Sequence, residues 1–522
     1  MFDYIIVGAG TAGCVLASRL SEDRKTRVLL LEAGGPDRKK EIRIPLAFSK
    51  LFRSEIDWNY STEPEPHLAN RRLYWPRGKV LGGSSSMNAM IYIRGNPADY
   101  DRWRELGNTG WGFTDVLAYF KRAENQQRGA SEFHGTGGPL NVSDLREKHP
   151  LARAFVAAAE ETGFSRNDDF NGASQEGVGF YQVTQRRGRR WSAADAYLRP
   201  ALHRRSLKIE PRAQVSEILF DKNRAIGVRY FQDGALNEVR AAREVILAGG
   251  TINSPQLLMH SGIGPADSLR KLGIEVIADL PGVGANLQDH LVMVVEYVCT
   301  KPITLETAES LPNYLRFLLF GSGPLTSNVA EAGIFTKTRK DSRAPDLQIL
   351  FGPCYYQKHG FDPPSDHRYS IGPTLIAPRS RGTISLRSKN PLDAPMIRAN
   401  YLAGDADMRV LVEGVKISRR IGGARAFAPY RGAETHPGIG VKSDEEIAGS
   451  IRATAETLYH PVGTCKMGTD AMAVVDPRLR VRGVEGLRVA DASVMPEIIA
   501  GNTNAPVVMI AEKAADIIRE DS

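Results

Sequence analysis

The chain opens with a buried strand that runs directly into a glycine-rich turn. Residues 4–7 (YIIV) are a continuous apolar run, Gly8-Ala9-Gly10-Thr11-Ala12-Gly13 follow, and the next residues suit a helix. A second apolar run, RVLLLEAGG, spans residues 27–35. This order of strand, turn, helix and strand predicts the start of a doubly wound α/β domain with a parallel sheet.

The glycines of the turn have a mechanical explanation. Gly8 permits the tight turn, Gly10 lets the backbone approach a pyrophosphate, and Gly13 lets helix and strand pack closely. Glu32 lies 19 residues after Gly13 (32 minus 13), at the end of the second strand, where its carboxylate can accept hydrogen bonds from ribose hydroxyls and repel a 2′-phosphate. We therefore expect a bound adenine dinucleotide, NAD or FAD, rather than NADP.

The composition excludes several other classes of function. The 522 residues include 42% hydrophobic residues, which is an ordinary globular composition for at least two domains. The net charge is +8, but Lys and Arg are dispersed along the chain, so no nucleic-acid partner is expected. The four cysteines lack CxxC or zinc-ligand spacing, so neither a disulfide framework nor a metal site is expected.

Two segments bear on cellular location. The opening strand leaves no room for a cleavable leader, so a cytoplasmic location is expected. No apolar run approaches the roughly 20 residues of a membrane span. Residues 311–325 (LPNYLRFLLFGSGPL) nevertheless cluster large apolar side chains. This cluster predicts a lid or a peripheral contact, with the inner face of the membrane as one candidate surface.

Three later stretches bear on the choice between the two cofactors. Residues 75–95 (WPRGKVLGGSSSMNAMIYIRG) form a second glycine- and serine-rich loop, which is either a surface turn or a cradle for another part of a long cofactor. Residues 244–265 (EVILAGGTINSPQLLMHSGIGP) form another strand, glycine turn and helix, with Ser254 expected to cap the helix and Pro255 at its first position. Residues 487–518 end in an apolar helical stripe whose start Asn504 can cap.

These stretches, in this order, resemble the glucose-methanol-choline (GMC) family of FAD-dependent oxidoreductases, from Phe2 to about Ile518. Within the family the chain looks most like bacterial FAD-linked alkanol and choline dehydrogenases, and residues 169–200, 279–291 and 326–335 are further stretches of that kind. The resemblance implies a Rossmann-like FAD-binding domain with an interleaved α+β substrate domain on a largely antiparallel sheet. FAD-binding segments are expected at residues 1–150, 191–300 and 451–522, and substrate-domain segments at 151–190 and 301–450.

The resemblance also implies which residues bind FAD. The expected contacts are Gly8, Gly10, Thr11, Ala12, Gly13, Glu32, Ala33, Val80, Gly82, Gly83, Asn88, Ala89, Met90, Ile91, Val215, Ala248, Gly249, Asp491, Ala492, Asn502 and Thr503. Some relatives attach FAD covalently through a histidine in the second loop, where this chain has Met87. Because a thioether cannot make that linkage, FAD is expected to bind noncovalently.

His460, within TLYHPVGTCKMG (residues 457–468), is the expected catalytic base. Taken alone, a His-Pro pair is more often a turn, but in the family a histidine of this segment faces the flavin together with a His or Asn, here Asn502, 42 positions later (502 minus 460). Hydride leaves an alcohol carbon only as the hydroxyl loses its proton, and imidazole, with an unperturbed pKa of roughly 6.5, can take that proton. Asn502 can donate to the substrate oxygen. His260, His290 and His436 have no comparable partner pattern.

Two further residues are expected near the substrate. Tyr459 adjoins the expected base in the sequence. Glu331 falls where some relatives place an acid near the substrate, and its carboxylate can attract a cationic head group. A structural hydrogen bond at a turn is the alternative role for Glu331, and it is the one that the sequence favours.

The expected function is the oxidation of a primary alcohol to an aldehyde, with FAD as hydride acceptor and a quinone or O2 as the final electron acceptor. A dehydrogenase is favoured over an oxidase, and a choline dehydrogenase-like activity stays open. Two remoter alternatives are a light-driven fatty-acid photodecarboxylase and a non-catalytic flavoprotein binding module. Both are expected to lack the base, so the presence of His460 and Asn502 disfavours them. The alcohol's identity and the oligomeric state stay open.

Overall fold

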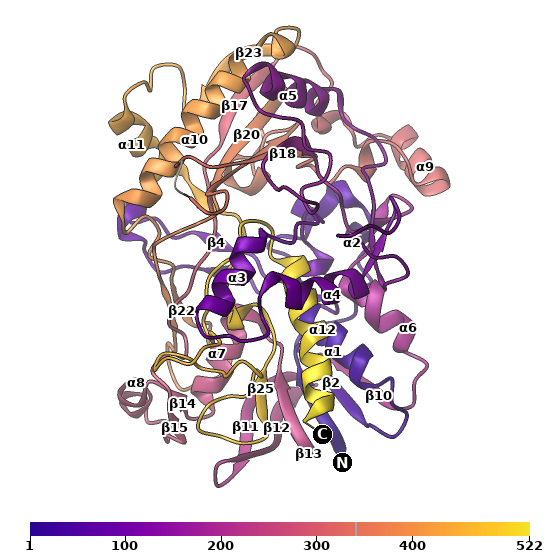
Figure 1. Cartoon of the computed structure of the whole chain (residues 1–522), viewed down its shortest axis with the longest axis vertical. Helices are drawn as coiled ribbons and strands as arrows, with labels where there is room; N and C mark the ends of the chain where they lie inside the picture. The colour runs from indigo at the N-terminus through magenta and orange to yellow at the C-terminus, as the bar shows by residue number, and fades with distance from the viewer. Residues whose placement is uncertain (340–341, 522) are drawn as a thin grey trace.

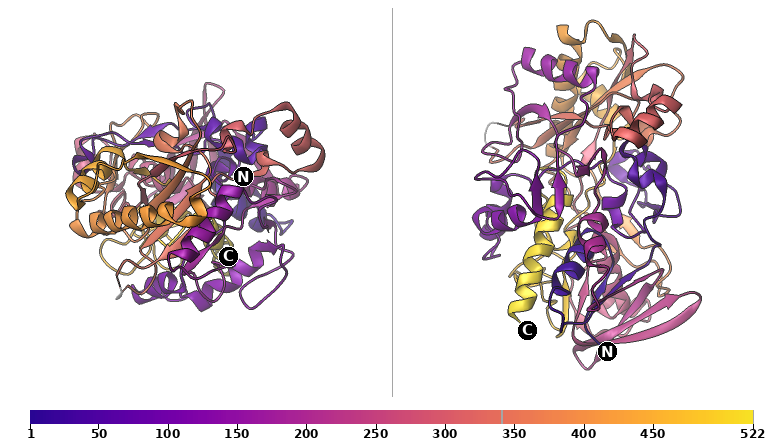
Figure 2. Two further views of the ribbon diagram at one scale, coloured as in Figure 1. Left: turned by 90° about the horizontal axis from the view of Figure 1, so that it is seen from above. Right: turned by 90° about the vertical axis from the view of Figure 1, so that its right-hand side faces the viewer.

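The computed structural model describes residues 1–339 and 342–521. Two sheets organise the molecule, one in the lower and one in the upper half of Figure 1. The chain passes between them several times, and its C-terminal helix, shown in yellow, returns to the sheet that contains the N-terminus. Figure 2 shows that the molecule is elongated along the axis that joins the two sheets.

The lower sheet is parallel at its core. Its strands lie in the order β10, β2, β1, β13 and β25, with bounds Leu207–Pro211, Val28–Glu32, Phe2–Val7, Ala235–Leu247 and Leu487–Val489. Ile5 pairs with Leu29 on one side and with Val245 on the other. Strand β2 is buried throughout, which explains why its sequence is a continuous apolar run. The two outer strands β11 (Gln214–Asp221) and β12 (Arg224–Gln232) continue antiparallel from β13.

Helices pack along the parallel strands. Helix α1 (Thr11–Leu20) follows β1, α7 (Gly250–His260) follows β13, and α12 (Asn504–Glu520) follows β25 and packs against α1. Helix α4 (Phe113–Ala123) packs against α12, and α3 (Pro97–Glu105) packs against α4. The fold is therefore a Rossmann-like α/β domain of the kind that the opening residues predict.

The upper sheet is antiparallel. Its main path runs β23, β17, β20, β19, β18 and β7, with bounds Arg431–His436, Val295–Cys299, Arg368–Leu375, Leu347–Gly352, Ala332–Thr336 and Gly177–Phe180. The short strands β16 (Leu291–Val292) and β24 (Glu456–Thr457) extend it beside β20. Helices α5 (Pro150–Glu161), α10 (Asp405–Gly423) and α11 (Asp444–Thr454) lie in the same half of the molecule.

The upper sheet has one face against helices and the other against a cavity. Phe351 stacks on Phe155 of α5 with ring centroids 4.8 Å apart, whereas its neighbours Leu350 and Gly352 line the cavity. Gly372, opposite Leu350 on the next strand, also lines the cavity. This alternation follows from the period of two in a strand. It places Leu350 and Gly352 of β19, and Ser370 and Gly372 of β20, at the cavity.

Two expected helix starts are corrected by the structure. Helix α7 begins at Gly250 rather than at Ser254, so Pro255 lies inside it. The carbonyl of Thr251, which Pro255 leaves without its helical N–H donor, accepts instead from the Thr464 hydroxyl at 2.6 Å. Helix α12 has Thr503 as its N-cap, and Asn504 is its first helical residue.

The sheets also refine the expected division of the chain. Residues 291–299, expected in the FAD-binding part, form β16 and β17 of the antiparallel sheet because both pair with β20. Residues 456–457 form β24 of the same sheet, although the segment 451–522 was expected in the FAD-binding part. None of the helices in residues 1–339 and 342–521 combines the length and apolar character that crossing a bilayer requires.

Candidate active site

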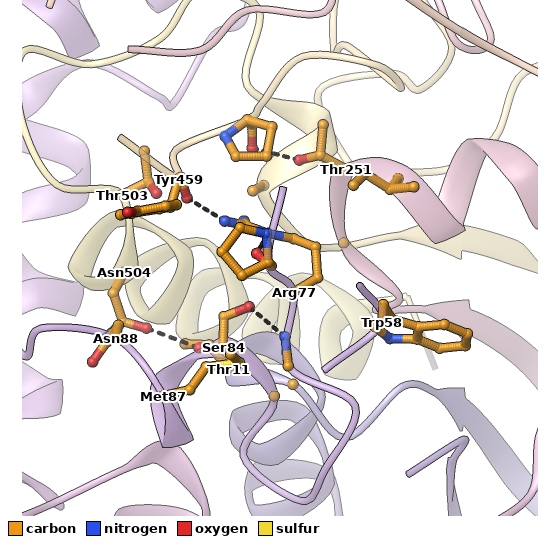
Figure 3. A pocket seen from close by; sticks show the side chains of 18 of the residues that line it. Thr11, Trp58, Arg77, Ser84, Met87, Asn88, Thr251, Tyr459, Thr503 and Asn504 are labelled. Atoms are coloured by element: carbon orange, nitrogen blue, oxygen red, sulfur yellow. Dashed lines mark hydrogen bonds between the residues drawn. The ribbon is translucent and has the colours of Figure 1, made fainter. Parts of the chain in front are cut away.

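A large cavity lies between the two sheets. Its lower wall is formed by the carboxyl ends of β1, β2 and β13 and by the loops that follow them. Its upper wall includes Val292, Leu350 and Gly372 of the antiparallel sheet. Ligands of open α/β sheets bind at the carboxyl ends of the strands, so this position is the one expected for a nucleotide cofactor. Figure 3 shows the cavity from close by.

The floor of the cavity is formed by backbone atoms of glycines at positions where a side chain would clash. Gly8 has φ +99°, and a Cβ there would lie 2.6 Å from the Ala248 carbonyl oxygen. A Cβ on Gly13 would lie 1.8 Å from the Gly8 carbonyl oxygen, and one on Gly83 would lie 2.6 Å from Gly10 Cα. The second glycine-rich loop therefore packs directly against the first. Together they form the close-packed cradle that a long dinucleotide requires.

Two helix N-termini meet at this cradle. Helix α1 begins at Thr11 with no acidic residue in its first turn, and α12 begins at Asn504 with none either. The Thr11 hydroxyl donates to the side-chain oxygen of Asn504 at 2.8 Å and so joins the two starts, as Figure 3 shows. The positive ends of both helices therefore favour negative charge in the cavity.

Two buried carboxylates line the cavity. Glu32 accepts the Ala9 N–H and the Gly34 N–H, both at 2.8 Å, and burial raises the pKa of its carboxyl to about 7. Asp491 accepts the Gly250 N–H at 2.8 Å. Its carboxylate also accepts the Ser254 hydroxyl at 2.6 Å, so Ser254 ties α7 to the last crossover instead of capping the helix. Both acids thus organise the turns that surround the cavity.

The second loop is held in place by a buried arginine. Asn88 Oδ1 accepts the Met90 N–H at 3.0 Å and Arg190 Nη1 at 2.8 Å, and the Asn328 side chain donates to the Ala89 carbonyl at 3.0 Å. Met87 is 3% exposed and lines the cavity, where Figure 3 places it beside Ser84. These side-chain contacts hold the backbone of the loop in place.

His460 and Asn502 lie together at the cavity, as predicted. Asn502 Nδ2 lies 3.2 Å from His460 Nε2. The His460 backbone N–H donates to Asp289 Oδ1 at 2.7 Å, and the Thr457 hydroxyl donates to Asp289 Oδ2 at 2.5 Å. Arg77 donates to the Tyr459 carbonyl at 2.6 Å (Figure 3). The loop that carries the imidazole is therefore held on both sides of His460.

A second histidine contacts the first. His290 Nδ1 lies 3.0 Å from His460 Nδ1, and the two rings meet edge to face at 88°. With Asn502 donating to Nε2 of His460, the His460 proton sits on Nδ1 and points to His290. In this tautomer Nε2 carries no proton, and its electron pair, which accepts from Asn502 Nδ2 here, is the one that can take a proton from a ligand.

The surroundings keep His460 neutral. Burial, followed by His290 and Arg77, lowers the pKa of the His460 imidazole well below its ordinary value. Burial lowers the pKa of His290 to about 3. Since only a neutral imidazole can accept a proton, both shifts favour the form that acts as a base.

Most of the predicted site residues line this one cavity: Gly8, Gly10, Thr11, Ala12, Glu32, Ala33, Gly83, Asn88, Ala89, Met90, Ile91, Val215, Ala248, Gly249, Tyr459, His460, Asp491, Ala492, Asn502 and Thr503. Gly13, Val80 and Gly82 lie behind its wall. They shape the turns: Val80 is fully buried and bridges Gly35, and Gly82 has φ +90°.

Glu331 does not line the cavity, so its expected contact with the substrate is not seen. Its carboxylate accepts the Ser327 hydroxyl at 2.6 Å and the His149 backbone N–H at 2.7 Å. Burial raises the pKa of this carboxyl to about 7. Its position is that of a structural hydrogen-bond acceptor beside a turn, the alternative that the sequence favours.

Two residues that the sequence reasoning passed over contact His460. His290 was set aside for lack of a partner pattern, and Asp289 was not considered. Both belong to the stretch DLPGVGANLQDHL (residues 279–291), which had been noted only as a likeness to the family. An Asp-His pair inside that stretch is a signal. That both contact His460, which lies 171 positions after Asp289 and 170 after His290, is decided by the fold.

Comparison with known proteins assigns the family. A GMC oxidoreductase N-terminal model matches residues 2–292, and a GMC oxidoreductase C-terminal model matches residues 378–511. The chain belongs to the GMC oxidoreductase family. It is 47% identical to an alcohol dehydrogenase [acceptor] of Pseudomonas putida, over 99% of this chain and 96% of that protein. It is also 47% identical to the mitochondrial choline dehydrogenase of Mus musculus, over 99% of this chain and 89% of that protein.

Solved structures of the GMC family share the whole fold. Pyridoxine 4-oxidase from Mesorbium loti superposes with a TM-score of 0.92 at 34% identity, covering 100% of this chain and 99% of that one. Formate oxidase from Aspergillus oryzae superposes with a TM-score of 0.93 at 27% identity, covering 100% and 98%. The protein is thus an FAD-dependent oxidoreductase that acts on alcohol-type, CH–OH donors. The glycine cradle and the two helix N-termini offer N–H donors, and Glu32 offers an acceptor; together these groups fit FAD.

Proposed function

We propose that this GMC oxidoreductase oxidises a neutral primary alcohol to the aldehyde, with His460 as the general base and noncovalently bound FAD. The observation that carries the proposal is the contact between His460 Nε2 and Asn502 Nδ2 at 3.2 Å in the cavity. A base and a hydrogen-bond donor so close together can hold one alcohol oxygen between them. FAD, when bound, supplies the hydride acceptor.

The chain's own residues prepare the proton transfer. His460 Nε2 carries the free electron pair that takes the hydroxyl proton, and His460 Nδ1 keeps its own proton toward His290. Asn502 Nδ2 donates to the alcohol oxygen and stabilises the negative charge that develops there. Asp289 and Arg77 hold the backbone of the catalytic loop, so the imidazole does not have to reorient.

The cavity wall supports a neutral substrate. Beside Tyr459 lie Phe48, Phe52 and Tyr356, with ring centroids of neighbouring members 5.7 to 6.3 Å apart. The cavity lining also includes the aliphatic side chains of Val292, Val294 and Leu350. The two carboxylates among the described cavity residues, Glu32 and Asp491, already accept backbone N–H groups in the cradle. An apolar or aromatic alcohol therefore finds complementary surface without an unpaired charge.

A quaternary-ammonium alcohol is the second candidate. Aromatic faces attract such cations, and a relative of this chain is a choline dehydrogenase. Arg77, which is partly buried in the same cavity, opposes a cation, because both charges would lie in a medium of lower dielectric constant than water. This repulsion favours the neutral alcohol.

Anaerobic stopped-flow spectroscopy tests the proposal. Mixing the FAD-loaded protein with aliphatic, aromatic and cationic primary alcohols in the dark should bleach the flavin fastest with the neutral alcohols. His460→Ala should keep FAD and slow that reduction by about two orders of magnitude or more. A variant that is reduced as fast as the wild type would refute the role of His460, and fastest reduction by choline would refute the substrate class.

The final electron acceptor is tested in a second mixing step. We propose a quinone rather than O2. Reduced protein mixed with a soluble quinone should reoxidise faster than the same protein mixed with air-saturated buffer. The reverse order of rates would make the enzyme an oxidase.

A further inference from the structure

Helix α9 (Leu311–Phe320) presents an apolar stripe to solvent. Leu311, Leu315, Leu318, Leu319 and Phe320 are between 49% and 73% exposed. The spacing of 311, 315, 318 and 319 places these side chains on one face of the helix. Elsewhere in the part of the chain that the structure describes, the large exposed apolar residues lie far apart in sequence. Figures 1 and 2 show α9 at the outer edge of the upper half, away from both sheets.

Helix α9 is held in place, although its apolar stripe faces solvent. Phe317, the buried side chain of α9, anchors the helix, and Arg189 lies over its ring at 5.7 Å. The helix ends at Gly321, with φ +57°, and Gly188 packs so tightly there that a Cβ would lie 2.2 Å from the Gly321 carbonyl oxygen. The following turn, Pro324–Thr326, packs against residues 45–51. The exposed leucines are therefore presented by a fixed helix.

Unpaired positive charge borders the stripe. The turn that packs on the end of α9 carries Arg186, Arg187 and Arg189, all exposed. Arg146 donates to the Gly321 carbonyl at 3.3 Å. Among residues 1–339 and 342–521, none of these four arginines has an ion-pair partner.

The neighbouring carboxylates do not cancel this charge. Glu147 pairs with Arg316 of α9, and Glu309, just before the helix, pairs with Lys50. Each of these acids is thus matched by a cation of its own. The positive charges of the four arginines therefore stay unpaired beside the stripe. This positive margin is complementary to a surface that carries negative charge.

The stripe adjoins the apolar side of the active-site cavity. Leu305 and Ala308, in the segment that leads into α9, belong to one buried cluster with Phe48, Phe52 and Val329. The last three line the cavity. A continuous apolar path therefore runs from the wall of the cavity to the foot of α9.

We propose that α9 and the arginine turn form a docking surface for an anionic phospholipid bilayer, with α9 lying in the plane of the head groups. A helix with an apolar face and basic margins binds such surfaces by burying its apolar side chains at the boundary of the acyl chains. The arginines add electrostatic attraction to the anionic head groups. Docking would also bring apolar alcohols or a lipid-soluble acceptor from the bilayer to the cavity.

A second copy of the chain is a poorer occupant. In a twofold dimer built on this stripe, the same patch of each copy would face the other. The unpaired arginines of both copies would then meet across the contact, and like charges there oppose association. The bilayer supplies the opposite charge, whereas a second copy supplies the same one.

Vesicle sedimentation tests the proposal with the full-length, FAD-loaded protein. Vesicles of phosphatidylcholine with phosphatidylglycerol should carry down the wild type, and vesicles of phosphatidylcholine alone should carry down much less. The triple variant Leu315→Ser, Leu318→Ser, Leu319→Ser should lose about ten-fold or more of the partition coefficient. The double variant Arg186→Gln, Arg187→Gln should lose the preference for anionic vesicles.

Matched control variants distinguish a loss of vesicle binding from a loss of folding. Leu202→Ser removes a leucine that is 61% exposed elsewhere on the surface, and Arg398→Gln removes an exposed arginine away from α9. Both should sediment like the wild type. Flavin content and melting temperature identify any variant that fails to fold.

Two results would overturn the proposal. One is wild-type protein that stays in solution with anionic vesicles. The other is a wild-type dimer, measured by light scattering without lipid, that becomes monomeric in the triple leucine variant, since the stripe would then be a protein interface. Neither readout depends on alcohol oxidation, so the docking surface and the proposed function can fail separately.

Discussion

Replacing His290 should slow flavin reduction and shift its pH dependence. His290 Nδ1 accepts the proton of His460 Nδ1 across 3.0 Å; the His290 ring is fully buried, and His460 is half-buried at the cavity. His290→Leu removes that acceptor, so His460 loses the contact that selects the tautomer with a free electron pair on Nε2. We therefore treat His290 as a positioning residue that acts through His460.

The expected size of the effect follows from the lost hydrogen bond. A neutral hydrogen bond contributes about 0.5–1.5 kcal/mol, and a buried donor left unpaired costs about 1–3 kcal/mol. Since each 1.4 kcal/mol corresponds to about a factor of ten in rate, flavin reduction in His290→Leu should be about 10- to 100-fold slower. Binding of the alcohol should change little, because Asn502 and the cavity wall remain.

The pH dependence separates positioning from a general loss of structure. His290 is, after burial, the next cause that holds the pKa of His460 below its ordinary value. Its removal should raise that pKa. A base acts only above its own pKa, so the reduction rate of the wild type should stay level to low pH and that of His290→Leu should begin to fall at a higher pH.

Anaerobic stopped-flow measurements across a pH series provide the assay. His290→Asn keeps a carbonyl oxygen near the position of Nδ1 and should recover most of the rate. His436→Gln, at a half-buried histidine of the upper sheet, is the matched control and should behave as the wild type. If His290→Leu matched the wild type in rate and in pH profile, the tautomer argument would be wrong.

Three further predictions concern stability and the cofactor. Gly13→Ala should lower FAD content and melting temperature, because its Cβ would lie 1.8 Å from the Gly8 carbonyl oxygen. Gly449→Ala in α11, where a Cβ has open space, should stabilise the fold by up to about 1 kcal/mol. Equal melting curves for the two variants would contradict this prediction. Burial lowers the pKa of His436 to about 4. Between about pH 6.5 and 4 the unfolded chain therefore binds a proton at His436 that the folded protein does not. The free energy of unfolding should decrease as the pH falls through this range, and it should decrease less steeply in His436→Gln. Identical slopes of the free energy of unfolding against pH in the two proteins would disprove this. Because Met87 cannot attach FAD, acid precipitation should release all the flavin to the supernatant, and a yellow pellet would show otherwise.

The opening of the fold could be predicted because its cause is local. Residues 4–7 of β1 and 28–31 of β2 are apolar because both faces of the strands are buried there, and that pattern is visible in a single sequence. The start of α7 could not be predicted in the same way. Pro255 lies within the helix because the Thr464 hydroxyl, 213 positions away, satisfies the carbonyl of Thr251.

Some residues of the candidate site could likewise be predicted from the sequence, and others could not. His460 and Asn502 were predicted as a pair from the family resemblance, and the structure places their side chains 3.2 Å apart. His290 was overlooked since nothing in the sequence near it reveals that its ring meets His460. Glu331 was expected near the substrate, but its oxygens are occupied by Ser327 and by the His149 backbone.

The sequence by itself determined the first strand, turn, helix and strand, because these depend on neighbouring residues. Its motifs also carried the family resemblance that implied FAD and the pairing of His460 with Asn502. Only the tertiary structure decided which histidine contacts His460, which carboxylates reach the cavity, and that the apolar face of α9 is left in solvent. Those outcomes depend on where side chains far apart in the chain come to lie, and that is set by the packing of the two sheets against each other.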